Sequence, residues 1–131
     1  MKWLCRNLYR KEKGFTLVEL MVVIIILAIL TGIAIPSYMA LRNRARTAAA
    51  QSEMKNIATA LEIYQADKET YPAEATWNTD LQTGGYMNPV PTTDPWNVAN
   101  GYVYVLISAT SYTLTCASAT PDIVIKDGQL Q

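Results

Sequence analysis

The stretch KEKGFTLVELMVVIIILAILTGIAIPSYMALRNRAR, residues 11–46, decides how this chain folds. From Leu17 to Ile35 nearly every residue is Leu, Val, Ile, Met or Ala, and Glu19 is the single charged residue of that run. As a helix rising ~1.5 Å per residue, the run is roughly 28 Å long, close to the hydrocarbon thickness of a bilayer. The rest of a 131-residue chain is too small to surround such a helix. We therefore predict that it spans a membrane.

The charges on either side of the apolar run predict its orientation. Five basic residues precede it and three arginines follow it: Lys2, Arg6, Arg10, Lys11 and Lys13, then Arg42, Arg44 and Arg46. The positive-inside rule favours a cytoplasmic N-terminus. From residue 47 onward Asp and Glu outnumber Lys three to one. An acidic body behind one short basic cluster argues against general affinity for nucleic acid.

A cleaved secretory signal peptide is the alternative reading of the N-terminus. Such a signal has a shorter apolar region, followed closely by small residues at its cleavage site. Here the nearest small residues, at positions 48–50, come after the three arginines. The pattern therefore favours a membrane helix.

A helical pattern continues beyond the apolar run. One face carries an apolar stripe, formed by Met54, Ile57, Ala58, Leu61 and Tyr64. The residue before a proline avoids helical geometry, so the helix should end before Tyr71-Pro72. We predict one helix from Phe15 to about Ala66, kinked or locally loosened at Pro36.

The C-terminal part of the chain shows strand patterns. Residues 71–100 hold most of the prolines and predict an ordered loop, with one helical turn near residues 80–82. Residues 101–108, 111–117 and 123–126 are rich in β-branched and aromatic residues and predict three strands of an antiparallel meander. Packed on the apolar stripe of the helix, they give an α+β fold.

The segment KGFTLVE resembles the bacterial type IV prepilin signal, which type IV pilins share with the pseudopilins of type II secretion. The resemblance implies that a membrane peptidase cleaves between Gly14 and Phe15 and methylates Phe15. Glu19 matches a glutamate of the family that takes part in filament assembly. Pro36 matches the proline that follows the apolar run in these proteins. The implied pilin fold has a leader (1–14), a transmembrane and polymerisation helix (15–36), an amphipathic half of the stem helix (37–70), and a loop and antiparallel β-sheet head (71–131).

Two further segments, YQADKETYP and GGYMNPVPTTDPW, are similar to the end of the stem and to the following loop of major pseudopilins. Asn97 stands where those proteins commonly carry glycine. Their acidic C-terminal loop binds calcium, whereas this tail offers only Asp122 and Asp127, short of the six to eight oxygens that calcium takes. We therefore expect no cofactor, with calcium at Asp122 and Asp127 as the alternative. Once the leader is removed, Cys116 is a lone cysteine, and we expect it to be a small buried hydrophobe.

The resemblance implies a structural subunit, most simply the major pseudopilin of a type II secretion system that drives protein export. The alternatives are the major pilin of a surface pilus for adhesion, twitching motility or DNA uptake, and a membrane-anchored binding module that does not polymerise. The implied partners are copies of itself, minor pilins or pseudopilins, prepilin peptidase, an inner-membrane platform, a cytoplasmic ATPase and the lipid bilayer, without nucleic acid. The implied location is the inner membrane, with the head outside, and then a periplasmic pseudopilus or extracellular pilus.

An enzyme is not expected. The chain contains no histidine, and it lacks a nucleophile-elbow pattern, a phosphate-binding glycine loop and a cluster of metal ligands.

Overall fold

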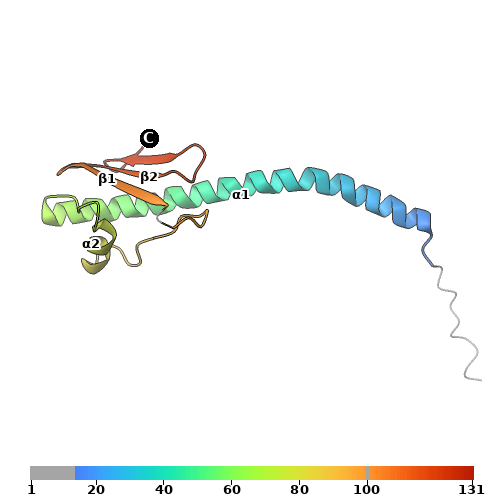
Figure 1. Ribbon diagram of the computed structural model, residues 1–131, viewed down its shortest axis with the longest axis horizontal. Coiled ribbons are helices and arrows are strands. Elements are labelled where there is room, and N and C mark those ends of the chain that lie inside the picture. Colours follow the sequence, from blue (N-terminus) through green and yellow to red (C-terminus); the bar gives the residue numbers. More distant parts are fainter. Residues whose placement is uncertain (1–13, 100) are drawn as a thin grey trace, which may run out of the picture. The chain divides into compact units, whose positions relative to one another are not determined.

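The computed structural model describes residues 14–99 and 101–131 (Figure 1). The elements follow the order α1 (Leu17–Lys68), α2 (Trp77–Thr83), β1 (Tyr102–Ser108), β2 (Ser111–Cys116), β3 (Ile123–Lys126) and β4 (Gln129–Leu130). The chain divides into two units, one ending at Ala40 and the other covering Leu41–Gln131. We call the second unit the head. Of the predicted leader, residues 1–13 lie outside the described residues.

The N-terminal unit contains the apolar part of α1. The large hydrophobic side chains of this part of the helix are exposed on every side, from Val23 at 48% to Leu17 at 74%. Within the described residues, α1 is the one helix long and apolar enough to cross a membrane, and none of its most apolar window is buried. A helix that is apolar all round needs a lipid or protein environment. The structure thus agrees with the predicted membrane helix.

Helix α1 continues through Pro36. A proline lacks the N–H that would bond to the carbonyl four residues earlier, here the carbonyl of Gly32. Polar side chains on either side are satisfied within the helix, because the Thr31 hydroxyl donates to the Leu27 carbonyl (2.7 Å) and the Ser37 hydroxyl donates to the Ile33 carbonyl (3.1 Å). These hydroxyls therefore need no partner from the lipid.

The head contains a four-stranded antiparallel sheet in the order β1-β2-β3-β4. Its register places Tyr104 opposite Leu114, and Leu114 opposite Ile125, so these three side chains share one face. Burial alternates along β2, as expected for a strand with one covered face. The three predicted strands are confirmed. The two-residue strand β4 was not predicted, since it is too short to show a pattern.

The core of the head lies between the C-terminal part of α1 and the inner face of the sheet (Figure 1). From α1 it contains Ala50, Met54, Ile57, Ala58, Ala60 and Leu61. From the sheet it contains Tyr102, Tyr104, Tyr112, Leu114, Cys116, Ile123 and Ile125. The prediction of an α+β fold with a long N-terminal helix on a small antiparallel sheet is confirmed. Cys116 is free and fully buried, as expected, and burial raises the pKa of its thiol.

Aromatic rings attach the loop after α1 to the sheet. The Tyr112 ring lies 4.7 Å from the Tyr71 ring and 5.8 Å from the Tyr104 ring, measured between centroids. The Tyr104 hydroxyl donates a 2.9 Å hydrogen bond to the Pro72 carbonyl. The helical turn expected near residues 80–82 is helix α2, whose Leu81 is fully buried. The loop is therefore ordered by packing, as its prolines and aromatic residues suggested.

Candidate functional site

The N-terminus of α1 carries a reciprocal cap. The Thr16 hydroxyl accepts a hydrogen bond from the Glu19 N–H (3.2 Å) and donates one to Glu19 Oε2 (2.9 Å). The same Oε2 accepts a hydrogen bond from the Thr16 N–H (2.8 Å). This arrangement is a capping box, in which residues three apart satisfy each other's free backbone donors. A cap of this kind stabilises a helix by about 1 kcal/mol.

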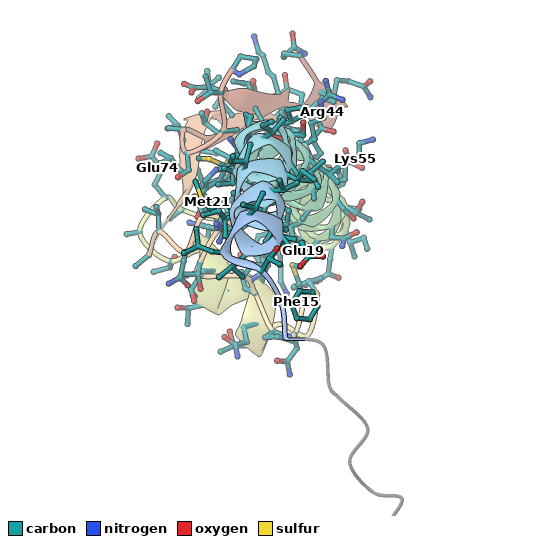
Figure 2. The ribbon with its side chains drawn as sticks, turned by 90° about the vertical axis from the view of Figure 1, so that its right-hand side faces the viewer. Phe15, Glu19, Met21, Arg44, Lys55 and Glu74 are labelled. Carbon is teal, nitrogen blue, oxygen red and sulfur yellow. The ribbon has the colours of Figure 1, made fainter. Side chains whose placement is uncertain are left out.

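The cap gives Glu19 a defined position and leaves one of its oxygens available. Within the described residues, both hydrogen bonds of the Glu19 side chain use Oε2. The carboxylate lies in the first turn of α1, where the helix dipole favours negative charge. Figure 2 shows Glu19 and Phe15 at this end of the helix. A cation from another molecule could therefore reach Oε1 without breaking the cap.

The predicted cleavage site lies immediately before the cap. Gly14, Phe15 and Thr16 are outside the helix, and all three are exposed. A side chain added at Gly14 would meet no atom within 4 Å. The structure brings Gly14, Phe15 and Glu19 together in one short segment. Pro36 lies 17 residues after Glu19 along α1, or roughly 26 Å away at ~1.5 Å per residue, so it belongs to a different part of the helix.

Thr16 was not among the site residues predicted from the sequence. The signal was present, because the segment Thr16-Leu17-Val18-Glu19 has the spacing of a capping box directly before an apolar run.

A second structured segment is the loop before β1, which is built around Asp94. Its side chain is 4% exposed, and Oδ1 accepts hydrogen bonds from the Trp96 N–H (3.0 Å) and the Val98 N–H (2.9 Å). A Cβ at Gly101 would overlap the Asp94 side chain. Asn97 has φ 68°, a left-handed conformation in which asparagine is the best substitute for glycine. The loop thus holds Asn97 in a backbone conformation that favours glycine.

Several contacts set the pKa of the Asp94 carboxyl. Burial raises the pKa, but the hydrogen bonds from Ser118 and from the N–H groups of Val98 and Trp96, together with the charge of Arg46, lower it further than burial raises it. The net result is a pKa below the ordinary value for aspartate. Asp94 is therefore a buried carboxylate that the loop stabilises in its charged form.

The two calcium candidates do not form a common site. Asp122 comes directly before β3 and Asp127 directly after it, so the four residues of the strand separate them by more than 10 Å at ~3.3 Å per residue. Asp127 Oδ1 accepts a 2.9 Å hydrogen bond from the Tyr112 N–H. No group of three or more His, Cys, Asp or Glu residues suited to a metal occurs in residues 14–99 and 101–131. The carboxylates of Asp122 and Asp127 alone supply fewer oxygens than the six to eight that a calcium ion takes.

Comparison with known proteins gives matches along most of the chain. Residues 9–35 match the family described as prokaryotic N-terminal methylation motif, and residues 37–123 match the family described as type II secretion system protein G. The type II secretion system core protein G of Pseudomonas aeruginosa is 35% identical over 113 residues, covering 73% of this chain and 75% of that protein. The protein of the same name from Vibrio cholerae is 32% identical over 108 residues, covering 73% and 72%.

A component of a type IV pilus also matches. The type IV wide pilus major component PilA4 of Thermus thermophilus is 33% identical over 113 residues, covering 86% of this chain and 85% of that protein. No solved structure gives a significant match.

Proposed function

The chain belongs to the family of type II secretion system protein G, and from that premise we propose that it is the major subunit of a pseudopilus that drives protein export. The family consists of structural pilin and pseudopilin subunits, which assemble into filaments and are not enzymes. The observation that carries the proposal is the N-terminal segment, in which a capped Glu19 directly follows an exposed cleavage sequence on an apolar helix.

The role of Glu19 in assembly follows from electrostatics in a medium of low dielectric constant. Cleavage after Gly14 creates an α-amino group at Phe15, which is positively charged at neutral pH. An isolated amine or carboxylate within lipid is costly, whereas the two together offset each other's desolvation. The amine of one copy meets the carboxylate of its neighbour, and the pair fixes the axial register of the packed helices. The available Oε1 of Glu19 supports this pairing, because Oε2 already serves the cap.

The finer assignments of partners and location rest on the family and on the charge distribution. Prepilin peptidase removes residues 1–14, and an inner-membrane platform with a cytoplasmic ATPase adds subunits, among them minor pseudopilins. The five basic residues before the apolar run hold the leader in the cytoplasm, so the head lies outside the inner membrane. The apolar part of α1 contacts lipid before assembly and other copies of the helix afterwards.

A surface pilus is the second candidate function, because the Thermus thermophilus pilus component matches a larger share of this chain than the two core G proteins described above. Deleting the gene in the source organism separates the two. Lost secretion of exoproteins with intact pili supports the pseudopilus, and lost pili with normal secretion supports the pilus. If both traits are normal and the protein never sediments as fibres, it is a membrane-anchored binding module.

The processing step gives a first testable prediction. In cells that possess the peptidase, mass spectrometry of the mature protein should show a chain that begins at methylated Phe15. Changing Gly14 to valine should leave the leader attached, because a β-branched side chain at the cleaved bond obstructs the peptidase. The control is Gly32→Ala, since Gly32 also has open space around it and lies far from the cut. A mature wild-type chain that still begins at Met1 overturns the proposed processing.

The geometry of the C-terminal hairpin gives a second prediction, that the head needs no calcium. Strand β4 pairs with β3, the Gln131 N–H donates to the Val124 carbonyl (2.9 Å), and Asp127 binds the Tyr112 N–H. Gly128 has φ +77° and lies so close to Glu62 of α1 that a Cβ would overlap its carboxylate. We expect thermal unfolding of the full-length protein in detergent to be unchanged between millimolar calcium and excess chelator.

Two substitutions check the origin of this stability. Asp127→Ala should lower the unfolding free energy by about 1–2 kcal/mol, the cost of a lost hydrogen bond to a charged group, whereas Asp122→Ala should have little effect. A calcium-dependent rise in the unfolding temperature that Asp122→Ala abolishes would show that the ion is bound after all.

A further inference from the structure

Two basic side chains and one acidic side chain project from opposite sides of the head. Figure 2 shows Arg44 and Lys55 on one side of the head and Glu74 on the other. Arg44 and Lys55 are 11 residues apart on α1, about three helical turns, so their side chains point in similar directions. Both are exposed, and Lys68–Asp67 is the only ion pair within the residues that the structure describes. Arg44 therefore has no ionic partner in its own chain there.

The flank with Glu74 also has a hollow. It has a volume of about 230 Å³ and is lined by Glu74, Ala75, Trp77, Asn78, Pro91, Thr92 and Tyr102. Glu74 Oε1 accepts a 2.8 Å hydrogen bond from the Leu106 N–H, which positions the carboxylate and leaves Oε2 available. The Trp77 ring lies 5.6 Å from the Tyr104 ring and is half-buried, so its position is also set by packing.

These lining groups suit a guanidinium ion. A carboxylate accepts strong hydrogen bonds from arginine, and the face of an indole ring attracts a cation placed over it. The lining contains no lysine or arginine that would occupy or repel such a group. An arginine side chain satisfies both contacts better than lysine does, because its planar group can stack on an aromatic ring while it donates hydrogen bonds at its edge.

We propose that Arg44 of one copy enters the Glu74–Trp77 hollow of a neighbouring copy. This inference rests on the proposed function and names a contact between heads in the filament. Arg44 and Glu74 lie on opposite flanks, so the pairing joins different copies. Each copy then offers one donor flank and one acceptor flank. A contact between two different surfaces of the same protein repeats head to tail, and it builds an open helical array when the rotation between copies does not close into a ring.

Charge reversal tests this contact in cells of the source organism, with sedimented filaments as the measure. We expect Arg44→Glu and Glu74→Arg each to lower filament yield by about tenfold, because like charges then face each other across the contact. The double variant restores opposite charges and should return the yield to within about threefold of wild type. Single variants that assemble as well as wild type, or a double variant that is not restored, overturn the pairing.

Two control variants separate the head contact from other causes of a lower filament yield. Arg42→Glu changes the same charge two residues away, where the side chain points about 200° round the helix, and should leave the yield within about twofold of wild type. Glu74→Gln keeps an acceptor for the Leu106 N–H and removes only the charge, so a loss of filaments without a lower unfolding temperature supports the contact. A loss accompanied by an unfolded head contradicts it.

Cysteine cross-linking provides a readout that does not depend on yield. Arg44→Cys combined with Ala75→Cys should give disulfide-linked ladders of the protein, whereas Arg42→Cys with Ala75→Cys should not. Wild-type filaments without a ladder from the first pair refute the head contact and leave the proposed function intact. Absence of any wild-type filament refutes the proposed function itself.

Discussion

Changing Glu19 to alanine is expected to lower filament assembly by at least about 100-fold, while the protein still folds and enters the membrane. The reason is electrostatic, since removing the carboxylate leaves the neighbour's α-amino group without a partner in lipid. A charged group in that environment costs about 3 kcal/mol, and each 1.4 kcal/mol corresponds to a factor of ten. Sedimented filaments and membrane-bound protein, quantified by immunoblot in the source organism, measure the effect.

Two variants separate the pairing from the helix cap. Thr16→Val removes the hydroxyl of the capping box but keeps the Glu19 charge, so we expect a loss of only a few fold, matching the ~1 kcal/mol of a cap. Glu19→Gln keeps a side-chain acceptor for the Thr16 N–H but removes the charge, and should resemble Glu19→Ala. Normal filament levels from Glu19→Ala would refute the pairing, and equal losses from Thr16→Val and Glu19→Gln would assign the effect to the cap instead.

Changing Asp94 to alanine should destabilise the head more than changing Asp127 or Asp122 to alanine. It leaves the N–H groups of Trp96 and Val98 without their acceptor in a mostly buried loop. An unsatisfied buried donor costs about 1–3 kcal/mol, so we expect a loss of about 3 kcal/mol in the free energy of unfolding. Urea denaturation of the full-length protein in detergent, followed by tryptophan fluorescence, measures it. Asn97→Gly is the control and should change stability by less than about 1 kcal/mol, because the backbone there is already left-handed.

The charge of Asp94 also predicts how stability depends on pH. Its pKa is lower in the folded protein than the ordinary value near 4. A lowered pKa contributes stability that is fully present above the unfolded value and is lost as the pH falls through the folded value. The contribution of Asp94 to the free energy of unfolding should therefore be constant from about pH 5 to 8 and should decrease below about pH 4. Asp94→Asn should be less stable at neutral pH and should lose less on acidification, and an unchanged acid slope in this variant would contradict the assignment.

The sequence predicts the main elements well, because their signals are periodic and long. The apolar run and the stripe from Met54 to Leu61 specify helix α1, and the alternation of Tyr112, Leu114 and Cys116 specifies a strand with one buried face. The helix ends at Lys68, two residues beyond the predicted end near Ala66. Such small differences arise because the last helical turn depends on contacts as well as on propensity.

The features that the sequence did not reveal depend on contacts between distant residues. Asp94 is one of many acidic residues, and its burial depends on Gly101 and on Cys116, whose sulfur lies 4.0 Å from its carboxylate. The Glu74 carboxylate is positioned by a hydrogen bond from the N–H of Leu106, which lies 32 residues later in the chain. No local pattern marks such partners. The capping box of Thr16 and Glu19 is different, because its spacing is local and could have been read from the sequence.

The contact between Glu74 and Leu106 also bears on how the protein avoids aggregation. Strand β1 lies at the edge of the sheet, and its outward side chains Val103, Val105 and Ile107 are exposed and β-branched. An open edge of this composition is a template for amyloid-like strand addition. The Glu74 carboxylate accepts a hydrogen bond from the Leu106 N–H, and the Tyr71 N–H donates one to the Ala109 carbonyl just beyond the strand. These two hydrogen bonds therefore leave fewer free backbone groups at this edge for a strand of another subunit to pair with.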